Sequence, residues 1–144
     1  MPILKFNVKA KSENSTKTVI EARGFTMTID EPADLGGKDE AANPLEYVLA
    51  ALSGCLNVVG HVIAKEMGIE LKGLEIEIEG DLEPSKFLGL CEDGRAGYTD
   101  IQVTVKPDTD ADPATLAKWL KAVECRCPVT DTIKNATPLT ISLG

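Results

Sequence analysis

The longest apolar stretch of the chain, Asn43–Gly68, predicts one helix that is apolar on nearly every side. Asn43 can cap its N-terminus, Pro44 suits the first position because proline has no N–H to leave unpaired, and Gly68 can end it. Such a helix either crosses a membrane or fills a core. Three polar residues interrupt it at roughly helical spacing: Ser53, Asn57 and His61. The chain has no second stretch of this kind, so we predict a buried core helix and no membrane span.

Alternation of apolar and polar residues predicts strands on both sides of this helix, because successive side chains of a strand face opposite ways. Before the helix, the pattern covers Leu4–Val8, Thr18–Ala22 and Phe25–Ile29. The last two are hinged at Arg23-Gly24, which indicates an antiparallel meander. After the helix, the pattern covers Leu74–Glu79, Ile101–Lys106 and Leu139–Leu143.

Two shorter helices are predicted between the last two strands. Asp112 can cap the first of them, and its apolar stripe consists of Leu116, Trp119, Leu120 and Val123. The second begins at Cys127-Pro128.

The charged, glycine-containing segment Glu31–Ala42 is expected to be a loop or lid. The order of elements predicts a single α+β domain over residues 1–144, with antiparallel sheets packed around a long central buried helix.

Net charge restricts the partners of the protein. The 144 residues carry a net charge of −8 and the basic ones are scattered, so we expect no nucleic acid and no anionic membrane as partners. The apolar part of the N-terminal sequence MPILKFNVKAK is too short for a secretory signal, and we expect a cytoplasmic protein. Its four cysteines are then reduced at rest, which leaves thiol chemistry, metal binding or packing as their roles.

Cys55 and Cys127 are the candidate reactive residues. Cys127 precedes Pro128 at a predicted helix N-terminus, where unpaired N–H groups and the helix dipole favour a thiolate. Cys55 lies in the middle of the long helix, where burial raises a thiol pKa, so its activation requires a cation supplied by the fold. Periodicity leaves the alternative open that each is simply a small buried apolar residue.

The other candidate residues have simpler explanations. His61 follows Cys55 by six residues, about 240° around the helix, so we expect a polar residue satisfied in the core and not a partner of the cysteine. Cys125 and Cys127 could form a CxC redox pair or half of a zinc site, but the sequence offers no further converging ligands, and we expect no metal and no cofactor. Cys91 lies in a glycine-containing connection and is expected to have no role.

Three motifs carry a family resemblance. They are NPLEYVLAALSGC at the start of the long helix, RCPVTDTI near the C-terminus, and EPADLGG ahead of the helix. Together they resemble the OsmC/Ohr family of osmotically inducible and organic-hydroperoxide-resistance proteins, over essentially the whole chain. The resemblance implies an intertwined homodimer with two sites at its interface.

The resemblance also implies a cysteine-based thiol peroxidase that acts on organic hydroperoxides. Cys55 would attack the peroxide oxygen and become a sulfenic acid, and Cys127 would condense with it to a disulfide. The family's reductants are dithiols, often lipoylated proteins, and the sequence identifies none here. The partners expected on this basis are a second copy of the chain, the hydroperoxide and a dithiol.

The sequence departs from the family pattern around the reactive cysteine. Family peroxidases usually place a glutamate two residues after the Asn of the Asn-Pro pair, where it holds an arginine from the turn between the first two strands. This chain has Leu45 there and Glu46 one place later, about 100° around the helix. The nearest arginine in sequence is Arg23, one strand further on, and the nearest cations of the turn are Lys11 and Lys17. Glu46 and Arg23 are therefore candidate supporting residues that lack the family spacing.

Two other functions are compatible with the same features. A non-catalytic relative would keep the fold and bind a small apolar ligand at the dimer interface, and the missing glutamate and arginine favour it. A general thiol–disulfide oxidoreductase would use both cysteines without a peroxide. The retained pair, Cys55 and Cys127, favours the peroxidase, which is our working hypothesis.

Overall fold

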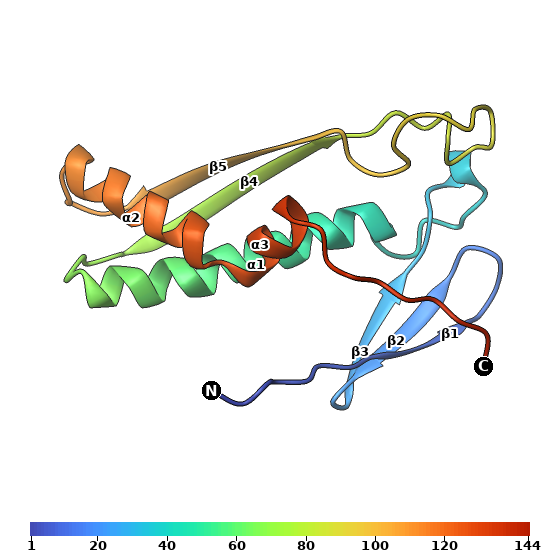
Figure 1. The fold of residues 1–144 in the computed structure, drawn as a ribbon, viewed down its shortest axis with the longest axis horizontal. Coiled ribbons are helices and arrows are strands. Elements are labelled where there is room, and N and C mark those ends of the chain that lie inside the picture. Colours follow the sequence, from blue (N-terminus) through green and yellow to red (C-terminus); the bar gives the residue numbers. More distant parts are fainter. The chain divides into compact units, whose positions relative to one another are not determined.

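Five strands and three α-helices make up the computed structural model, which describes residues 1–144 (Figure 1). In chain order the elements are β1 (Lys9–Ser12), β2 (Thr18–Ala22), β3 (Phe25–Ile29), the 3-10 helix η1 (Ala33–Leu35), α1 (Pro44–Glu66), β4 (Gly73–Asp81), β5 (Asp100–Asp108), α2 (Pro113–Arg126) and α3 (Pro128–Lys134). The class is α+β, as predicted. The chain forms two compact units, Met1–Val48 and Leu49–Gly144, divided within α1. A single domain over residues 1–144 stays a prediction.

The unit Met1–Val48 contains the antiparallel meander β1-β2-β3. Strands β2 and β3 have the predicted bounds, and Ile20, the buried residue of this sheet, pairs with Met27. The predicted hinge is confirmed, since Arg23 and Gly24 have φ angles of 52° and 88°. A two-residue turn with both φ angles positive matches the right-handed twist of the strands it joins. The turn therefore supports the register of β2 on β3.

Asp30 organises the loop that follows β3. The residue is 1% exposed, and its carboxylate accepts hydrogen bonds from the N–H groups of Glu31 (2.8 Å) and Glu40 (3.1 Å) and from the Thr16 hydroxyl (2.8 Å). These bonds, the one from Glu31 first, hold the pKa of the carboxyl below its ordinary value. The predicted loop Glu31–Ala42 is therefore anchored near both of its ends.

The ends of α1 are formed by the residues that the sequence predicts. The N–H of Glu46 donates to the Asn43 side chain (2.8 Å), and the N–H of Asn43 donates to the Glu46 carboxylate (3.0 Å). This reciprocal capping box satisfies two N–H groups at the start of the helix. Gly68, with φ of 69°, adopts the left-handed conformation that ends it.

Only one face of α1 is buried. That face consists of Leu52, Leu56, Gly60, Ile63 and Ala64. On the other side Val58 is 60% exposed and Val62 is 46% exposed, so within the single chain the predicted core helix is buried along one face. By length and hydropathy, 1.7 on average, α1 could cross a membrane, but the core helix of a soluble protein passes the same test.

The unit Leu49–Gly144 packs α1 and α2 against the antiparallel hairpin of β4 and β5. Gly73 pairs with Asp108 at one end of the hairpin and Asp81 pairs with Asp100 at the other. The apolar face of the hairpin contacts a buried cluster of both helices; its packing residues are Leu74, Ile76, Ile78, Ile101 and Val105. Both strands and their alternation are confirmed. On the opposite face Lys106 pairs with Glu77 (2.7 Å), as expected for a solvated surface.

The predicted first and last strands are absent. Leu4–Val8 and Leu139–Leu143 have no strand structure, and β1 begins only at Lys9. Their apolar residues are exposed: Phe6 and Ile141 are each 88% exposed. Alternation makes a segment suitable for a sheet, but a strand forms only where another strand can pair with its N–H and C=O groups. Neither segment has such a partner within the chain.

Candidate functional site

The two predicted catalytic residues lie in contact. The sulfurs of Cys55 and Cys127 share a hydrogen bond of 3.1 Å although 72 positions separate them in sequence. Cys55 comes from the middle of α1, and Cys127 stands between α2 and α3. Cys127 has no exposed surface, whereas Cys55 is partly exposed. The pair is free of any disulfide, so the structure holds two reduced thiols at a distance from which they can react.

Pro128 explains the position of Cys127. A residue before proline is disfavoured in helical conformation, and Cys127 has φ −78° and ψ 113°, which ends α2 and starts α3. Its sulfur accepts a hydrogen bond from the N–H of Thr130 at 3.5 Å, as the N-cap of α3. Cys125 is exposed while Cys127 is buried. The two therefore face different surroundings, which argues against the CxC pair.

The pKa values of the two thiols shift in opposite directions. Burial raises the pKa of Cys127, but hydrogen bonds from the Thr130 hydroxyl and N–H, from Cys55 and from the N–H of Val129 together bring it below its ordinary value. For Cys55, burial raises the pKa, the N–H of Val129 opposes this, and Cys127 adds to the rise. Cys127 is thus the more acidic thiol of the pair, as its position predicts, and Cys55 is the less acidic one.

The candidate supporting residues have partners of their own in the unit Met1–Val48. The Glu46 carboxylate belongs to the capping box of α1, and the Arg23 guanidinium lies 5.3 Å from the centre of the Phe25 ring. Arg23 and Glu46 form no ion pair with each other. The structure therefore does not join them as the family arrangement would.

The turn between β1 and β2 carries a paired cation that the prediction did not select. Lys17 contacts the carboxylates of Glu13 (3.1 Å) and Glu40 (2.9 Å), and 23% of its side chain is exposed. The hydrogen bond to Glu40, followed by that to Glu13, raises the pKa of Lys17 and keeps it charged. Only the spacing in the family pattern pointed to this turn in the sequence.

The remaining candidates stay outside the site. His61 is exposed, and its Nδ1 lies 2.9 Å from the Asn57 carbonyl one turn earlier, so it has a local hydrogen-bond partner. The prediction that it lies in the core is wrong. Cys91 is exposed, and its thiol donates to the Asp93 carbonyl (3.3 Å). No group of three or more His, Cys, Asp or Glu side chains is arranged to hold a metal ion.

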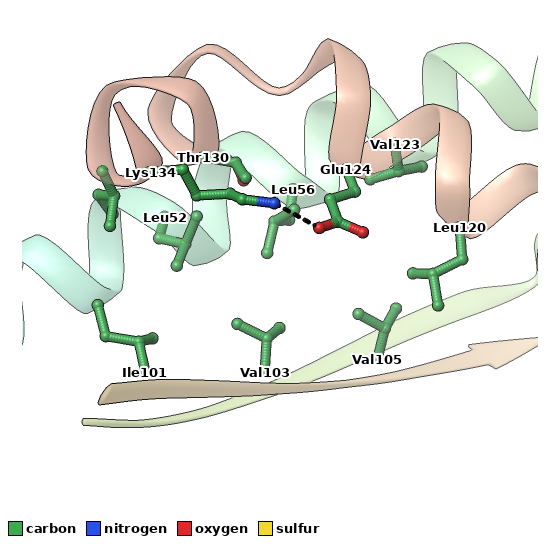
Figure 2. Close-up of a pocket in the computed structure, with 11 residues that line it drawn as sticks. Leu52, Leu56, Ile101, Val103, Val105, Leu120, Val123, Glu124, Thr130 and Lys134 are labelled. Atoms are coloured by element: carbon green, nitrogen blue, oxygen red, sulfur yellow. Dashed lines mark hydrogen bonds and ion pairs between the residues drawn. The ribbon is translucent and has the colours of Figure 1, made fainter. Parts of the chain in front are cut away.

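An apolar groove of about 440 Å³ lies between α1, α2, α3 and β5; neither cysteine lines it, but residues next to them do (Figure 2). Thr130, which donates to Cys127, lines it, and so do Leu52 and Leu56 on either side of Cys55 in sequence. The other lining residues are Ile101, Val103, Val105, Leu120, Val123, Glu124, Ile133 and Lys134. Figure 2 shows the β5 side chains pointing from the sheet toward the helices. No local pattern in the sequence indicates this groove, because its lining residues come from four separate elements, α1, β5, α2 and α3.

One ion pair crosses the wall of the groove. Lys134 on α3 contacts Glu124 on α2 at 2.9 Å, and both side chains are more than half exposed (Figure 2). The hydrogen bond lowers the pKa of Glu124 and raises that of Lys134. The lining of the groove is therefore mostly apolar, and its two charged residues, Glu124 and Lys134, are exposed to solvent.

Solved structures of other proteins share the fold. An OsmC-like protein from Mycoplasma pneumoniae is 18% identical, with a TM-score of 0.80 over 91% of this chain and 88% of its own. An organic hydroperoxide resistance protein OsmC from Legionella pneumophila is 17% identical (TM-score 0.66; 93% and 92% covered). One from Elizabethkingia anophelis is 13% identical (TM-score 0.67; 92% and 90% covered). At these identities the likeness shows the fold alone.

Sequence comparison gives the family. No curated protein sequence matches the chain. The family model described as OsmC-like protein matches residues 37–142, which include α1, both cysteines of the pair and the hairpin of β4 and β5. Because this match covers most of the chain, and the fold agrees with it, the protein belongs to the family of OsmC-like proteins.

Proposed function

We propose that this chain is a thiol peroxidase that reduces organic hydroperoxides. The observation that carries the proposal is the 3.1 Å contact of the Cys55 and Cys127 sulfurs, and an apolar groove lined by Leu52, Leu56 and Thr130 supports it. Two thiols in contact can form a disulfide with little backbone movement. An apolar groove suits the organic part of a hydroperoxide. Two structural relatives are named organic hydroperoxide resistance proteins, which agrees with this chemistry.

In the proposed reaction Cys55 attacks, because it is partly exposed and Cys127 is not. The Cys55 sulfur bonds to the terminal peroxide oxygen, the O–O bond breaks, and the leaving alkoxide takes the thiol proton; the products are an alcohol and a sulfenic acid. The Cys127 thiolate then attacks the Cys55 sulfur, and hydroxide leaves and takes a proton from solvent. An external dithiol reduces the disulfide and is itself oxidised. A reducing cytoplasm, the location we propose, suits this cycle.

The raised pKa of Cys55 means that a cation has to favour its thiolate. The family resemblance alone puts the activating cation in the turn between the first two strands, and on that basis we propose Lys17 for this role; within its own unit Lys17 pairs with Glu13 and Glu40. Replacing Lys17 with Met is expected to slow peroxide consumption and move its pH profile upward. Lys11→Met in the same hairpin is the control and is expected to leave the profile in place.

The proposal includes a homodimer, because the chain exposes apolar surface that a monomer leaves uncovered. One face of α1 is exposed, with Val58 at 60%, and so are the two terminal segments around Phe6 and Ile141. Segments with strand periodicity but no partner strand are suited to pairing with another chain. Light scattering at micromolar concentration is expected to give twice the mass of the chain. A monomer under these conditions would remove this part of the proposal.

The function is tested by adding one equivalent of an organic hydroperoxide to fully reduced protein and recording intact mass and peroxide loss. We expect wild type to lose two hydrogens, mapped by peptide analysis to a Cys55–Cys127 bridge. Cys55→Ser is expected to abolish peroxide loss, and Cys127→Ser to stop at the Cys55 sulfenic acid, which a dimedone probe would trap. Cys125→Ser is the matched control and is expected to behave as wild type. Reduced cysteines together with surviving peroxide would disprove catalysis.

A second function, binding of a small apolar ligand, is favoured by the same groove and by the absence of the family glutamate at Leu45. In that case Cys55 serves packing alone. The experiment above separates the two, because a binder leaves peroxide untouched. Retention of an apolar fluorescent probe by both wild type and Cys55→Ser, without peroxide loss, would then support binding.

A further inference from the structure

A buried tryptophan joins the two helices that lead to the reactive sulfurs. Trp119 on α2 is 2% exposed, and its indole N–H donates to the backbone carbonyl of Gly60 on α1, 2.8 Å away. Gly60 comes five residues after Cys55, and Trp119 comes eight residues before Cys127. The bond therefore connects α1 and α2 close to the point where their sulfurs meet.

The absence of a side chain at Gly60 permits this contact. A Cβ at that position would lie 3.2 Å from Cζ2 of Trp119 and 3.3 Å from Cδ2 of Leu74, which is tighter than ordinary van der Waals contact. Glycine in the middle of a helix is unfavourable for the helix itself. Here it lets the indole and the β4 side chain reach the helix backbone.

The hydrogen bond between Trp119 and Gly60 depends on direction, whereas the hydrophobic effect does not. Burial of apolar surface presses α2 onto α1 but depends little on its position along the axis. A hydrogen bond weakens steeply when its distance or angle changes. A displacement of α2 by one residue would move Cys127 by about 1.5 Å along the axis. Such a shift would change the distance between the two sulfurs, which is now 3.1 Å.

A second link between the same helices is more exposed. Arg126, next to Cys127, makes a two-pronged ion pair with Glu66 of α1 at 2.6 and 3.1 Å. Both side chains are 50% exposed. Exposed ion pairs contribute little to stability because water screens them, so the buried indole bond is the stronger constraint on α2.

We propose that Trp119 and Gly60 are positioning residues, whose indole–carbonyl bond sets α2 along α1 and so keeps the Cys55 and Cys127 sulfurs in contact. This inference rests on the proposed function, because the proposed function is what gives the sulfur pair a redox role. It adds two residues, neither of which touches a sulfur, that determine how readily the disulfide forms.

The test measures the equilibrium between the reduced pair and the Cys55–Cys127 disulfide in buffers of reduced and oxidised dithiothreitol. Two protein thiols lose their hydrogens, and the cyclic disulfide of the buffer gains them, so no peroxide is needed. Alkylation followed by peptide mass analysis gives the bridged fraction. The variants are Trp119→Phe, which keeps a ring but removes the N–H, and Gly60→Ala, which pushes the ring outward.

Both variants are expected to lower the equilibrium constant for bridge formation about tenfold, the size expected for losing one well-placed hydrogen bond. Two controls are expected to stay within about twofold of wild type. Arg126→Gln removes the exposed ion pair, and Ile20→Val removes a buried methylene from the β1-β2-β3 sheet. Far-ultraviolet circular dichroism and a cooperative thermal unfolding transition verify that each variant is folded.

Folded Trp119→Phe and Gly60→Ala proteins with the wild-type equilibrium constant would overturn the inference. An equal loss in the Ile20→Val control would also overturn it, since the effect would then follow general stability. If wild type forms the bridge with dithiothreitol but consumes no peroxide, the proposed peroxidase fails and the positioning role stands. If wild type forms no bridge at all, both fail.

Discussion

Met1–Val48 and Leu49–Gly144 bury different kinds of residue. In the first unit the buried residues are Ile20 and Asp30, and the carboxylate of Asp30 has three hydrogen-bond partners around it. In the second, one apolar cluster joins two helices and a hairpin, and the Cys127 thiol is part of it. The first unit is thus centred on a charge, the second on apolar contacts.

The candidate residues are divided between the two units. Cys55 and Cys127 belong to the apolar unit, where Cys127 is part of the buried cluster and Cys55 packs against it. Lys17, Glu46 and Arg23 belong to the polar unit, where ion pairs hold Lys17, a capping hydrogen bond holds Glu46 and a ring contact holds Arg23. Deletion of core volume should therefore disturb the sulfur pair, and acid should disturb the hydrogen bonds of Asp30.

The largest expected effect comes from a cavity in the apolar unit. Ile63 is 2% exposed, and Ile63→Ala is expected to lower the free energy of unfolding by about 2–5 kcal/mol. Hydrogen exchange should accelerate in the 49–66 peptides more than in the 18–29 peptides. Ile20→Ala in the other unit is the matched control and should reverse this ranking. Equal acceleration in both regions by both variants would mean that the units do not differ in this way.

A pH-dependent effect is expected in the polar unit. The pKa of Asp30 is lower in the folded protein than its ordinary value, so the folded state binds this proton less readily than the unfolded state does. The stabilisation is therefore complete above the ordinary aspartate pKa and is lost as the pH falls through the folded value. Urea midpoints recorded from pH 7 to 3 should fall more steeply for wild type than for Asp30→Asn. Parallel curves for the two proteins would contradict this role of Asp30.

The smallest expected effect concerns the start of α1, close to the division between the units. Asn43→Ala removes the side chain that accepts the N–H of Glu46 and is expected to cost about 1 kcal/mol. Exchange should increase in the first turn of α1 and leave the hairpin of β4 and β5 unchanged. Ser53→Ala, whose hydroxyl makes only an exposed bond within the helix, is the control and should stay close to wild type. Loss of protection in the hairpin would show that the cap supports more than its own helix.

Elements whose signals lie within a few residues were predicted well. The bounds of β2 and β3, the hinge at Arg23-Gly24 and the Asn43 cap follow from turn and capping preferences, which act over one to four positions. The same alternation gave strands at Leu4–Val8 and Leu139–Leu143 that the chain does not form. Alternation describes the two faces of a segment and contains no information on whether a pairing strand is available.

For the candidate site, the sequence supplied the residues but not their arrangement. A proline after Cys127 predicted a helix start and a thiolate there, and the structure agrees in direction. The pairing with Cys55 came from family resemblance, since no local pattern joins positions 72 apart. The groove, the Trp119 bond to Gly60 and the ion pairs of Lys17 had no signal in the sequence analysis, because each depends on contacts between separate elements.

By itself the sequence determined the three α-helices, the strands β2 to β5, their caps and turns and the apolar face of each hairpin strand, because these depend on neighbouring residues and on backbone preference. The tertiary structure alone decided that one face of α1 is buried, that Cys127 is shielded while Cys55 is partly exposed, and that their sulfurs meet. The physical reason is that burial and thiol acidity depend on which groups surround an atom in space, and those groups come from distant parts of the chain.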